Sequence, residues 1–363
     1  MHLGTPALLE FFRAHRNEDS LVLATVIGTV GSTYRKPGAM LLIARGGAYE
    51  GLISGGCLEG DLLHHAAGVF DTGAPVRLTY DMHADEELVW NLGLGCDGVI
   101  HLLLQRLDRE QEFAFLARLE ASHRERRAVL LALVTQSDGI LPLGAFGLVD
   151  SADISTGETE LRRFLEEMRD EWPAWRYEYL RFGADLQAEA VVVNIAPRTR
   201  VLLCGAGPDA VPMARACAEL DWEVVVVDHR PAFARAERFP RGCTVLQARP
   251  ERLAQTVDLD SLDAAVIMSH HLENDGAYLA GLAPHKIPYV GVLGPRARRD
   301  RLLEMARCPG RTVYGPVGLD IGAELPASIA LAVAAEIHAA LNQRDGRSLT
   351  RRTDDEQSDG SGN

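Results

Sequence analysis

The stretch RVLLCGAGPDAVPMARACAELDWEVVVVDHR, residues 200–230, decides the fold of the second half of this chain. An apolar run leads into a glycine turn, a helical pattern follows, and a second apolar run closes at Asp228. Strand, glycine turn, helix and strand in this order are typical of a doubly wound parallel sheet. Residues 205–210 match G-x-G-x-x-A, with Asp228 about 20 residues further on, as in dinucleotide-binding loops.

Two further apolar runs, DAAVIMSH at 263–270 and PYVGVL at 288–293, are each followed by a helical pattern. Alternation of short apolar strands with helices predicts a Rossmann-like domain with a parallel sheet over residues 196–341. Its last helix, at 326–341, is apolar on nearly all sides, so we expect it in a core or a subunit interface, the latter in a homodimer.

The first half predicts a different architecture, an α/β domain with mixed strands. Residues 1–107 contain a strand at 21–28, a glycine-rich loop, a hairpin and two later strand-like runs. Residues 108–195 read as a central α/β segment, which we expect to belong to the same N-terminal module. Residues 342–363 have almost no apolar side chain, and we expect a disordered tail there.

Composition excludes several classes of function. The formal net charge of −14 disfavours nucleic acid and anionic membranes as partners. The six cysteines are scattered without a C-x-x-C pair, which indicates a reducing compartment and excludes a zinc site of standard spacing. No apolar run approaches the ~18 residues of a membrane span. With no basic leader at the N-terminus, a cytoplasmic protein is expected.

The dinucleotide-like loop supports the fold more than it supports a particular ligand. Asp209 places a carboxylate in the first helical turn, where a pyrophosphate would sit, and two like charges repel there. Asp209 therefore disfavours NAD(P) as the ligand of this loop, and the alternative is a Rossmann-like scaffold that binds another ligand or only packs. Polar residues nevertheless gather at the carboxyl ends of the strands, which suits a phosphate-bearing ligand. The candidate binding residues are Gly205, Gly207, Asp228, His270 and Arg296.

A second candidate site centres on Cys57 in LISGGCLEGDLLHHA, residues 52–66. A thiol at the start of a helix lies near the positive end of the helix dipole, which favours thiolate. Gly55 and Gly56 allow a ligand to approach the backbone closely. Glu59 in the first helical turn opposes the thiolate, so the net effect on its pKa stays open.

Other loops of the N-terminal half add to this candidate site. Cys96 lies in a second glycine-rich turn, and the earlier loop supplies Ser32 and Arg35. Together with Cys57 they suit a pocket for an anionic ligand that favours sulfur. A mononuclear metal site built from the helix after Cys57 alone is disfavoured, because a helix spreads positions i and i+7 too far apart.

The motifs resemble those of the XdhC/CoxI family, accessory proteins of xanthine dehydrogenase and related molybdenum hydroxylases. They occur in family order over nearly the whole chain to residue 341, at residues 31–39, 55–59, 93–98, 204–215, 225–231, 289–302 and 315–326. The resemblance implies a chaperone, acting in purine catabolism, that binds and protects a molybdopterin-type cofactor, either with or without an attached nucleotide. It also implies sulfuration with a cysteine desulfurase and delivery to an apo-hydroxylase.

The family's glycine-flanked cysteine maps onto Cys57, which the resemblance implicates in cofactor binding as the contact to the metal. A soft thiolate suits a metal–dithiolene ligand. Two rival hypotheses stay open. The first is an NAD(P)-dependent oxidoreductase that uses the loop at 205–210, which micromolar NADPH affinity with hydride transfer would favour. The second is a docking protein without a cofactor site, which would tolerate Cys57→Ser.

Overall fold

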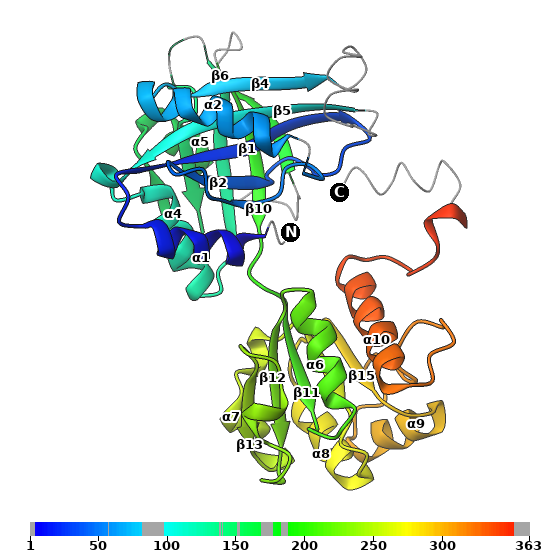
Figure 1. Ribbon diagram of the computed structural model, residues 1–363. Helices are drawn as coiled ribbons and strands as arrows, with labels where there is room; N and C mark the ends of the chain where they lie inside the picture. Colours follow the sequence, from blue (N-terminus) through cyan, green and yellow to red (C-terminus); the bar gives the residue numbers. More distant parts are fainter. Residues whose placement is uncertain are drawn as a thin grey trace. The chain divides into compact units, whose positions relative to one another are not determined.

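The computed structural model describes residues 4–56, 58–81, 98–137, 139, 141–150, 153–167, 177–182 and 188–351. The chain divides into two compact units, residues 1–197 with the last three residues and residues 198–360. Figure 1 shows the two units, which are described separately. Among the helices that are described, none has the length and apolarity needed to cross a bilayer.

The first unit contains the same series of elements twice (Figure 1). The first repeat comprises α1 (Thr5–His15), β1 (Ser20–Gly31), β2 (Met40–Ala44), β3 (Tyr49–Gly51), α2 (Glu59–Thr72), β4 (Val76–Asp81) and β5 (Gly98–Asp108). After η1 (Arg109–Gln111), the second repeat comprises α4 (Ala114–Arg124), β6 (Val129–Ser137), β7 (Phe146–Val149), β8 (Ile154–Thr156), α5 (Thr159–Glu167), β9 (Tyr177–Phe182) and β10 (Ala188–Ile195).

The two repeats form sheets of identical topology. Their strand orders are β3-β2-β1-β5-β4 and β8-β7-β6-β10-β9, and the pairings described in both sheets are antiparallel. Even the hydrogen bonds that enter the second strand correspond. Gly38 N–H donates to Val26 O at 2.8 Å, and Gly144 N–H donates to Val134 O at 3.0 Å. The first unit is therefore an internal structural duplication.

The repeats also pack on each other reciprocally. A Cβ added to Gly38 of the first repeat would lie 2.4 Å from Val193 Cγ1 in the second. A Cβ added to Gly144 of the second repeat would lie 3.0 Å from Gln105 Oε1 in the first. Val193 and Gln105 hold equivalent positions in β10 and β5. Each repeat thus places a glycine at the same point of close approach to the other.

A shared core lies between the two sheets and the helices α1 and α4. In β1, Leu21 and Leu23 face this shared core, whereas Val22 and Ala24 face a separate core beneath α2. Because both faces of the strand are covered, its sequence reads as a continuous apolar run rather than as an alternating one. A third core packs the second sheet against α5.

The second unit is a parallel sheet with helices on both faces (Figure 1). Its strands are β11 (Arg200–Cys204), β12 (Glu223–Asp228), β13 (Thr244–Gln247), β14 (Ala264–Ile267) and β15 (Tyr289–Val292). Its α-helices are α6 (Ala210–Glu219), α7 (Leu253–Thr256), α8 (Leu272–Leu282), α9 (Arg296–Met305) and α10 (Pro326–Leu341). Short 3-10 turns are η2 (Ala236–Arg238), η3 (Pro250–Arg252), η4 (Leu259–Ser261) and η5 (Leu349–Arg351).

The strand order β13-β12-β11-β14-β15 confirms the Rossmann-like prediction. The order reverses direction between β11 and β14, so the topological switch point lies at their carboxyl ends. Helices α6 and α10 cover one face, and α7, α8 and α9 cover the other. The apolar α10 is buried along one side in this core, although Leu331 remains 60% exposed.

Candidate functional site

Three connections of the first repeat join strand and helix ends at the same edge of its sheet. Gly31 at the end of β1 pairs with Gly98 at the start of β5, and β4 also ends beside the start of β5. Because β3 runs antiparallel to β2, it ends beside the start of β2, at this same edge. We call this edge the loop edge; its connecting segments are residues 32–39, 52–58 and 82–97.

The second repeat provides an internal comparison for these loops. Where residues 52–58 join β3 to α2, only residues 157–158 join β8 to α5. Where residues 82–97 join β4 to β5, only residues 183–187 join β9 to β10. The sheets themselves are the same, so the fold does not require the longer loops. The extra chain, with both of its cysteines, is a specialisation of the first repeat.

A hydrogen-bonded clamp between Ser54 and Glu59 shapes the segment around residue 57. Glu59 Oε1 accepts hydrogen bonds from the N–H groups of Ile53 at 3.2 Å and Ser54 at 2.9 Å. Glu59 Oε2 accepts a third from Ser54 Oγ at 2.6 Å. In turn, Ser54 Oγ accepts from the N–H groups of Gly56 at 3.2 Å and Leu58 at 3.0 Å. The residues on either side of position 57 are therefore bound to one hydroxyl.

The clamp changes the electrostatic role of Glu59. The side chain is only 2% exposed, and burial alone would raise its pKa. Hydrogen bonds from Ser54 and from backbone N–H groups outweigh this effect and hold the pKa of Glu59 below its ordinary value of 4.5. The carboxylate faces its own loop, where it stabilises the turn that leads into α2. That helix begins at Glu59, two residues later than Cys57.

The predicted residues of the loop edge that the structure describes are accessible. Gly55, Gly56 and Ser32 are exposed, and Arg35 is half-buried. A Cβ added to Gly55 or Gly56 would meet no atom of the described residues within 4 Å, so these residues leave space open above the turn. Cys57 and Cys96 themselves lie outside the described residues. Described residues include no cluster of three His, Cys, Asp or Glu side chains able to hold a metal ion.

Apolar side chains are also exposed along the loop edge. Val30 at the end of β1 is 60% exposed, and Tyr34 in the following loop is 59% exposed. Leu52 in the segment before the clamp is 36% exposed. These side chains add exposed apolar surface beside the glycine-rich turn.

In the second unit, internal packing requires the first glycine of the dinucleotide-like loop. A Cβ added to Gly205, which has φ of 122°, would lie 2.7 Å from the carbonyl oxygen of Met268. A Cβ added to Gly207 would lie 2.7 Å from Oδ1 of Asp209. Gly205 is thus explained by the close approach of the protein's own backbone, without a cofactor, whereas the atom nearest to Gly207 belongs to the end of a side chain.

The carboxylate that would contact a ribose is already occupied by protein donors. Asp228 is 1% exposed and accepts hydrogen bonds from Ala206 N–H at 2.8 Å and from Arg230 Nε and Nη2 at 2.9 and 2.7 Å. Burial would raise the pKa of Asp228, but the bonds from Arg230 and Ala206 outweigh burial and lower it. Arg230 also lies over the Phe233 ring, which holds the guanidinium in place.

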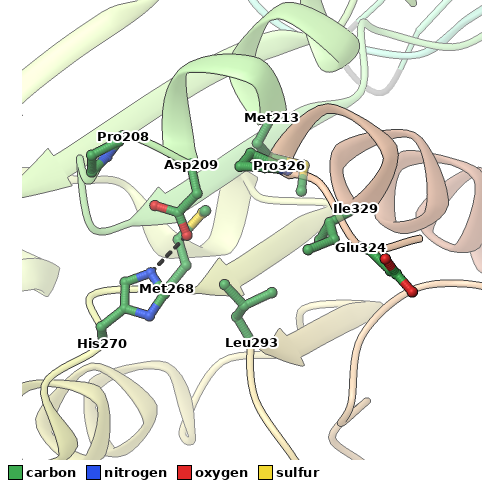
Figure 2. A pocket seen from close by; sticks show the side chains of 9 residues that line it. All are labelled: Pro208, Asp209, Met213, Met268, His270, Leu293, Glu324, Pro326 and Ile329. Atoms are coloured by element: carbon green, nitrogen blue, oxygen red, sulfur yellow. Dashed lines mark hydrogen bonds and ion pairs between the residues drawn. The ribbon is translucent and has the colours of Figure 1, made fainter.

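A cavity of about 330 Å³ opens beside the switch point, between α6, α10 and the ends of β14 and β15. Its polar lining residues are Asp209, His270 and Glu324. Its apolar lining residues are Pro208, Met213, Met268, Leu293, Pro326 and Ile329. Figure 2 shows Asp209 and His270 together on one wall, with Glu324 across the cavity.

The structure brings four of the five predicted residues of this unit around one loop. Asp228 binds the backbone between Gly205 and Gly207, and His270 Nε2 lies 2.7 Å from Asp209 Oδ2 on the same loop. Arg296 is exposed at the start of α9 and is not among the residues that line the cavity.

The neighbouring arginines serve structural contacts. Arg298 pairs with the buried Asp275 at 2.6 Å, and Arg299 donates to the carbonyl oxygen of Gly315 at 3.0 Å. Neither arginine lines the cavity. The sequence therefore located the basic residues of this region without revealing that their guanidinium groups are directed to the protein itself.

Sequence reasoning missed the Ser54–Glu59 clamp and the Asp209–His270 pair. The clamp follows a simple spacing, a serine followed five residues later by a glutamate at a helix start, and this spacing is visible in the sequence. The Asp209–His270 pair joins residues that are 61 positions apart, so only the parallel pairing of β11 and β14 reveals it.

These features define a class of protein, in which a duplicated antiparallel module carrying two long loops precedes a Rossmann-like domain. Residues 14–81 match the model of the XdhC and CoxI family, and residues 201–337 match the XdhC Rossmann domain. A probable xanthine dehydrogenase subunit from Bacillus subtilis is 32% identical, over 93% of this chain and 96% of that protein. The chain belongs to the XdhC and CoxI family.

Two further relatives also align with most of this chain. A crystal structure of a xanthine dehydrogenase from Bacillus halodurans is 27% identical, with a TM-score of 0.79 over 97% of this chain and 98% of that chain. The molybdenum cofactor insertion chaperone PaoD of Escherichia coli is 24% identical, over 87% of this chain and 82% of that protein. The similarity therefore extends over both units.

Proposed function

We propose that this chain is a chaperone that carries molybdenum cofactor as cargo, protects it, supports its sulfuration and inserts it into an apo-hydroxylase of the xanthine dehydrogenase type. Two relatives are named for xanthine dehydrogenase and one for insertion of the cofactor, which supports this role. The observation that carries the proposal is the loop edge, where the first repeat alone adds long loops with cysteines to a duplicated sheet.

The residues of the loop edge fit such a cargo. A thiolate at Cys57 is a soft ligand suited to molybdenum, and Cys96 is the second thiol of the long loops. Open space above Gly55 and Gly56 allows a bulky group to approach the backbone. Ser32 and Arg35 on the adjacent loop would hydrogen-bond the phosphate of the cargo. The clamp holds the turn on both sides of Cys57 in one conformation. Binding of the cargo therefore costs little conformational entropy in this turn.

The proposal implies two partners. The apo-hydroxylase accepts the cofactor, and a cysteine desulfurase supplies the sulfur for its maturation. Val30, Tyr34 and Leu52 are exposed next to the proposed cargo site, where an acceptor protein would have to approach. We expect the exchange to occur in the cytoplasm and the chain to act as a homodimer.

The described contacts argue against the rival role as an NAD(P)-dependent oxidoreductase. A ribose would have to displace Arg230 and the Ala206 N–H from Asp228. A pyrophosphate at the start of α6 would meet the carboxylate of Asp209. In this fold a dinucleotide usually binds through its ribose and its pyrophosphate. In this chain both of those contacts would be unfavourable.

Insertion can be tested with an apo-hydroxylase isolated from a cofactor-deficient host. The chain, purified from a cofactor-producing host, should restore hydroxylase activity, and Cys57→Ser should reduce that activity about tenfold or more, as loss of a metal contact does. Cys243→Ser, which alters a half-buried cysteine of the second unit, should leave activation unchanged. Equal activation by the Cys57→Ser variant and the native chain would instead indicate a docking protein without a cofactor site.

A further inference from the structure

The cavity of the second unit has a charge pattern that differs from that of a phosphate site. Its polar lining residues are two acids and one histidine, and no lysine or arginine of the described part of the chain lines it. The histidine is directed to Asp209, whose Oδ2 lies 2.7 Å from His270 Nε2. A phosphate entering this cavity would face two carboxylates without a compensating guanidinium or ammonium group. The lining thus favours a neutral or cationic ligand.

The carboxylate of Asp209 is held in place by both of its neighbouring loops. Its side chain is 20% exposed and pairs with His270, whose backbone has a φ of 63°, a conformation that residues other than glycine seldom adopt. The close contact of Gly205 with Met268 joins the two loops that carry this pair. Asp209 Oδ1 is buried and has no hydrogen-bond partner, whereas Oδ2 pairs with His270 and keeps a second lone pair for a donor in the cavity.

The second carboxylate differs from the first in exposure. Glu324 is exposed on the opposite wall, in the segment just before α10, as Figure 2 shows. A fixed acceptor on one wall and an exposed acceptor on the other suit a ligand with N–H donors at its edge, because an ionised carboxylate can only accept hydrogen bonds.

The rest of the lining suits an aromatic ring. Met213, Leu293 and Ile329 present apolar side chains to the cavity, and Met268 adds a second thioether. Thioether sulfur makes favourable contacts with aromatic rings, and an apolar wall with a few convergent polar groups is the usual composition of a small-molecule site. The volume of about 330 Å³ lies at the lower end of the range for such sites.

We propose that this cavity binds a planar heterocycle through an aminopyrimidinone edge, the edge that pterins and guanine share, with Asp209 and Glu324 as the acceptors of its N–H donors. The choice of pterin as the first probe rests on the proposed function, since the cargo contains a pterin. The cavity would then hold the organic part of a ligand and leave its phosphate outside the acidic walls. This second site lies in a different unit from the loop edge.

The test is equilibrium binding of free pterin to the full chain, followed by fluorescence anisotropy or calorimetry. Lumazine, which replaces the 2-amino group of pterin with oxygen, is the matched ligand control and should bind about tenfold more weakly, as expected for one lost hydrogen bond to a carboxylate. Guanosine is the second ligand to be measured. Its affinity relative to that of pterin shows whether the cavity prefers a guanine or a pterin, which share the aminopyrimidinone edge.

Variants of the two carboxylates complete the test. Asp209→Asn and Glu324→Gln should each weaken pterin binding about tenfold. Glu324 is exposed, so its variant tests the proposal even if Asp209→Asn fails to fold. Glu251→Gln, at an exposed acid of the same unit, is the matched control and should bind like the native chain.

Three results would overturn the inference: no binding of pterin or guanosine, equal affinity for pterin and lumazine, or affinity insensitive to both carboxylate variants. These outcomes are separable from the proposed function. Cofactor carried in a Cys57-dependent manner without pterin binding in the cavity refutes only the second site. Pterin binding in the cavity of a chain that carries no cofactor refutes only the chaperone.

Discussion

At the scale of single residues, Glu59 illustrates how a sequence-based expectation changes with geometry. From its position in the first turn of a helix alone, its charge would oppose a thiolate at Cys57. The structure directs the carboxylate into the loop, where Ser54 and two backbone N–H groups surround it. The main effect of the Glu59 carboxylate is therefore to hold the turn in one conformation. Any influence of Glu59 on the Cys57 thiol follows from the conformation of that turn.

Glu59→Gln should lower the free energy of unfolding of the first unit at neutral pH by about 1.5–3 kcal/mol, the range for a buried hydrogen bond to a charged group. Chemical denaturation measures this difference. Glu10→Gln on the exposed face of α1 is the control, with an expected change within about 0.5 kcal/mol. A clamp variant as stable as this control would contradict the structural role of Glu59.

The same variant predicts a pH dependence. The pKa of Glu59 is lower in the folded chain than its ordinary value of 4.5, so the unfolded state binds the proton more readily. The stabilisation is fully present above the unfolded pKa and is lost as pH falls through the folded pKa. The stability difference between the native chain and Glu59→Gln should therefore narrow below about pH 4.5. A difference that stays constant down to about pH 3 would contradict this assignment.

At the scale of elements, the duplication allows a comparison within one molecule. Gly38 and Gly144 hold equivalent positions with φ of 92° and 81°, yet they face different neighbours. An added Cβ at Gly38 would press on the branched and fully buried Val193, whereas at Gly144 it would meet the end of the flexible Gln105 side chain. The same substitution should therefore have unequal costs in the two repeats.

Gly38→Ala should destabilise the first unit by about 2–5 kcal/mol, from overpacking and left-handed backbone strain together. Gly144→Ala should cost about 1–2 kcal/mol, mostly from backbone strain. Denaturation of Gly38→Ala, Val193→Ala and the double variant should give a coupling energy of about 1 kcal/mol or more. Equal costs in the two repeats, or no coupling to Val193, would show that the repeats do not pack as described.

The sequence predicted the type of most elements but not this duplication. Apolar runs and glycine turns located β1, α6 and β12, and burial on both faces of the strands leaves continuous apolar stretches. The repeats share few identical residues, and the segments LVLATV at 21–26 and VLLALV at 129–134 are too generic to signal homology. The paired glycine–alanine steps at 38–39 and 144–145 were the most specific signal, and they gain meaning only from the hydrogen bonds around them.

At the scale of the whole molecule, the chain separates two kinds of chemistry. In the first unit the connections at the loop edge carry two cysteines and Arg35 in their sequence, and the second unit offers carboxylates around an apolar cavity. The sequence predicted Gly55, Gly56, Ser32 and Arg35 as members of one site, but their common edge follows from strand register, which composition cannot give. Ion pairs such as that of Asp228 with Arg230 direct charged groups toward the protein interior. These pairs, too, can be recognised only once the fold is known.

The central claim is that the first unit carries the molybdenum cofactor through Cys57. The most direct test is the molybdenum and pterin content of the chain purified from a cofactor-producing host, compared between the native chain, Cys57→Ser and the Cys243→Ser control. We predict that both components accompany the native chain and the control and fall about tenfold or more in Cys57→Ser. Equal content in all three, or neither component on the native chain even after cofactor is added, would contradict the account.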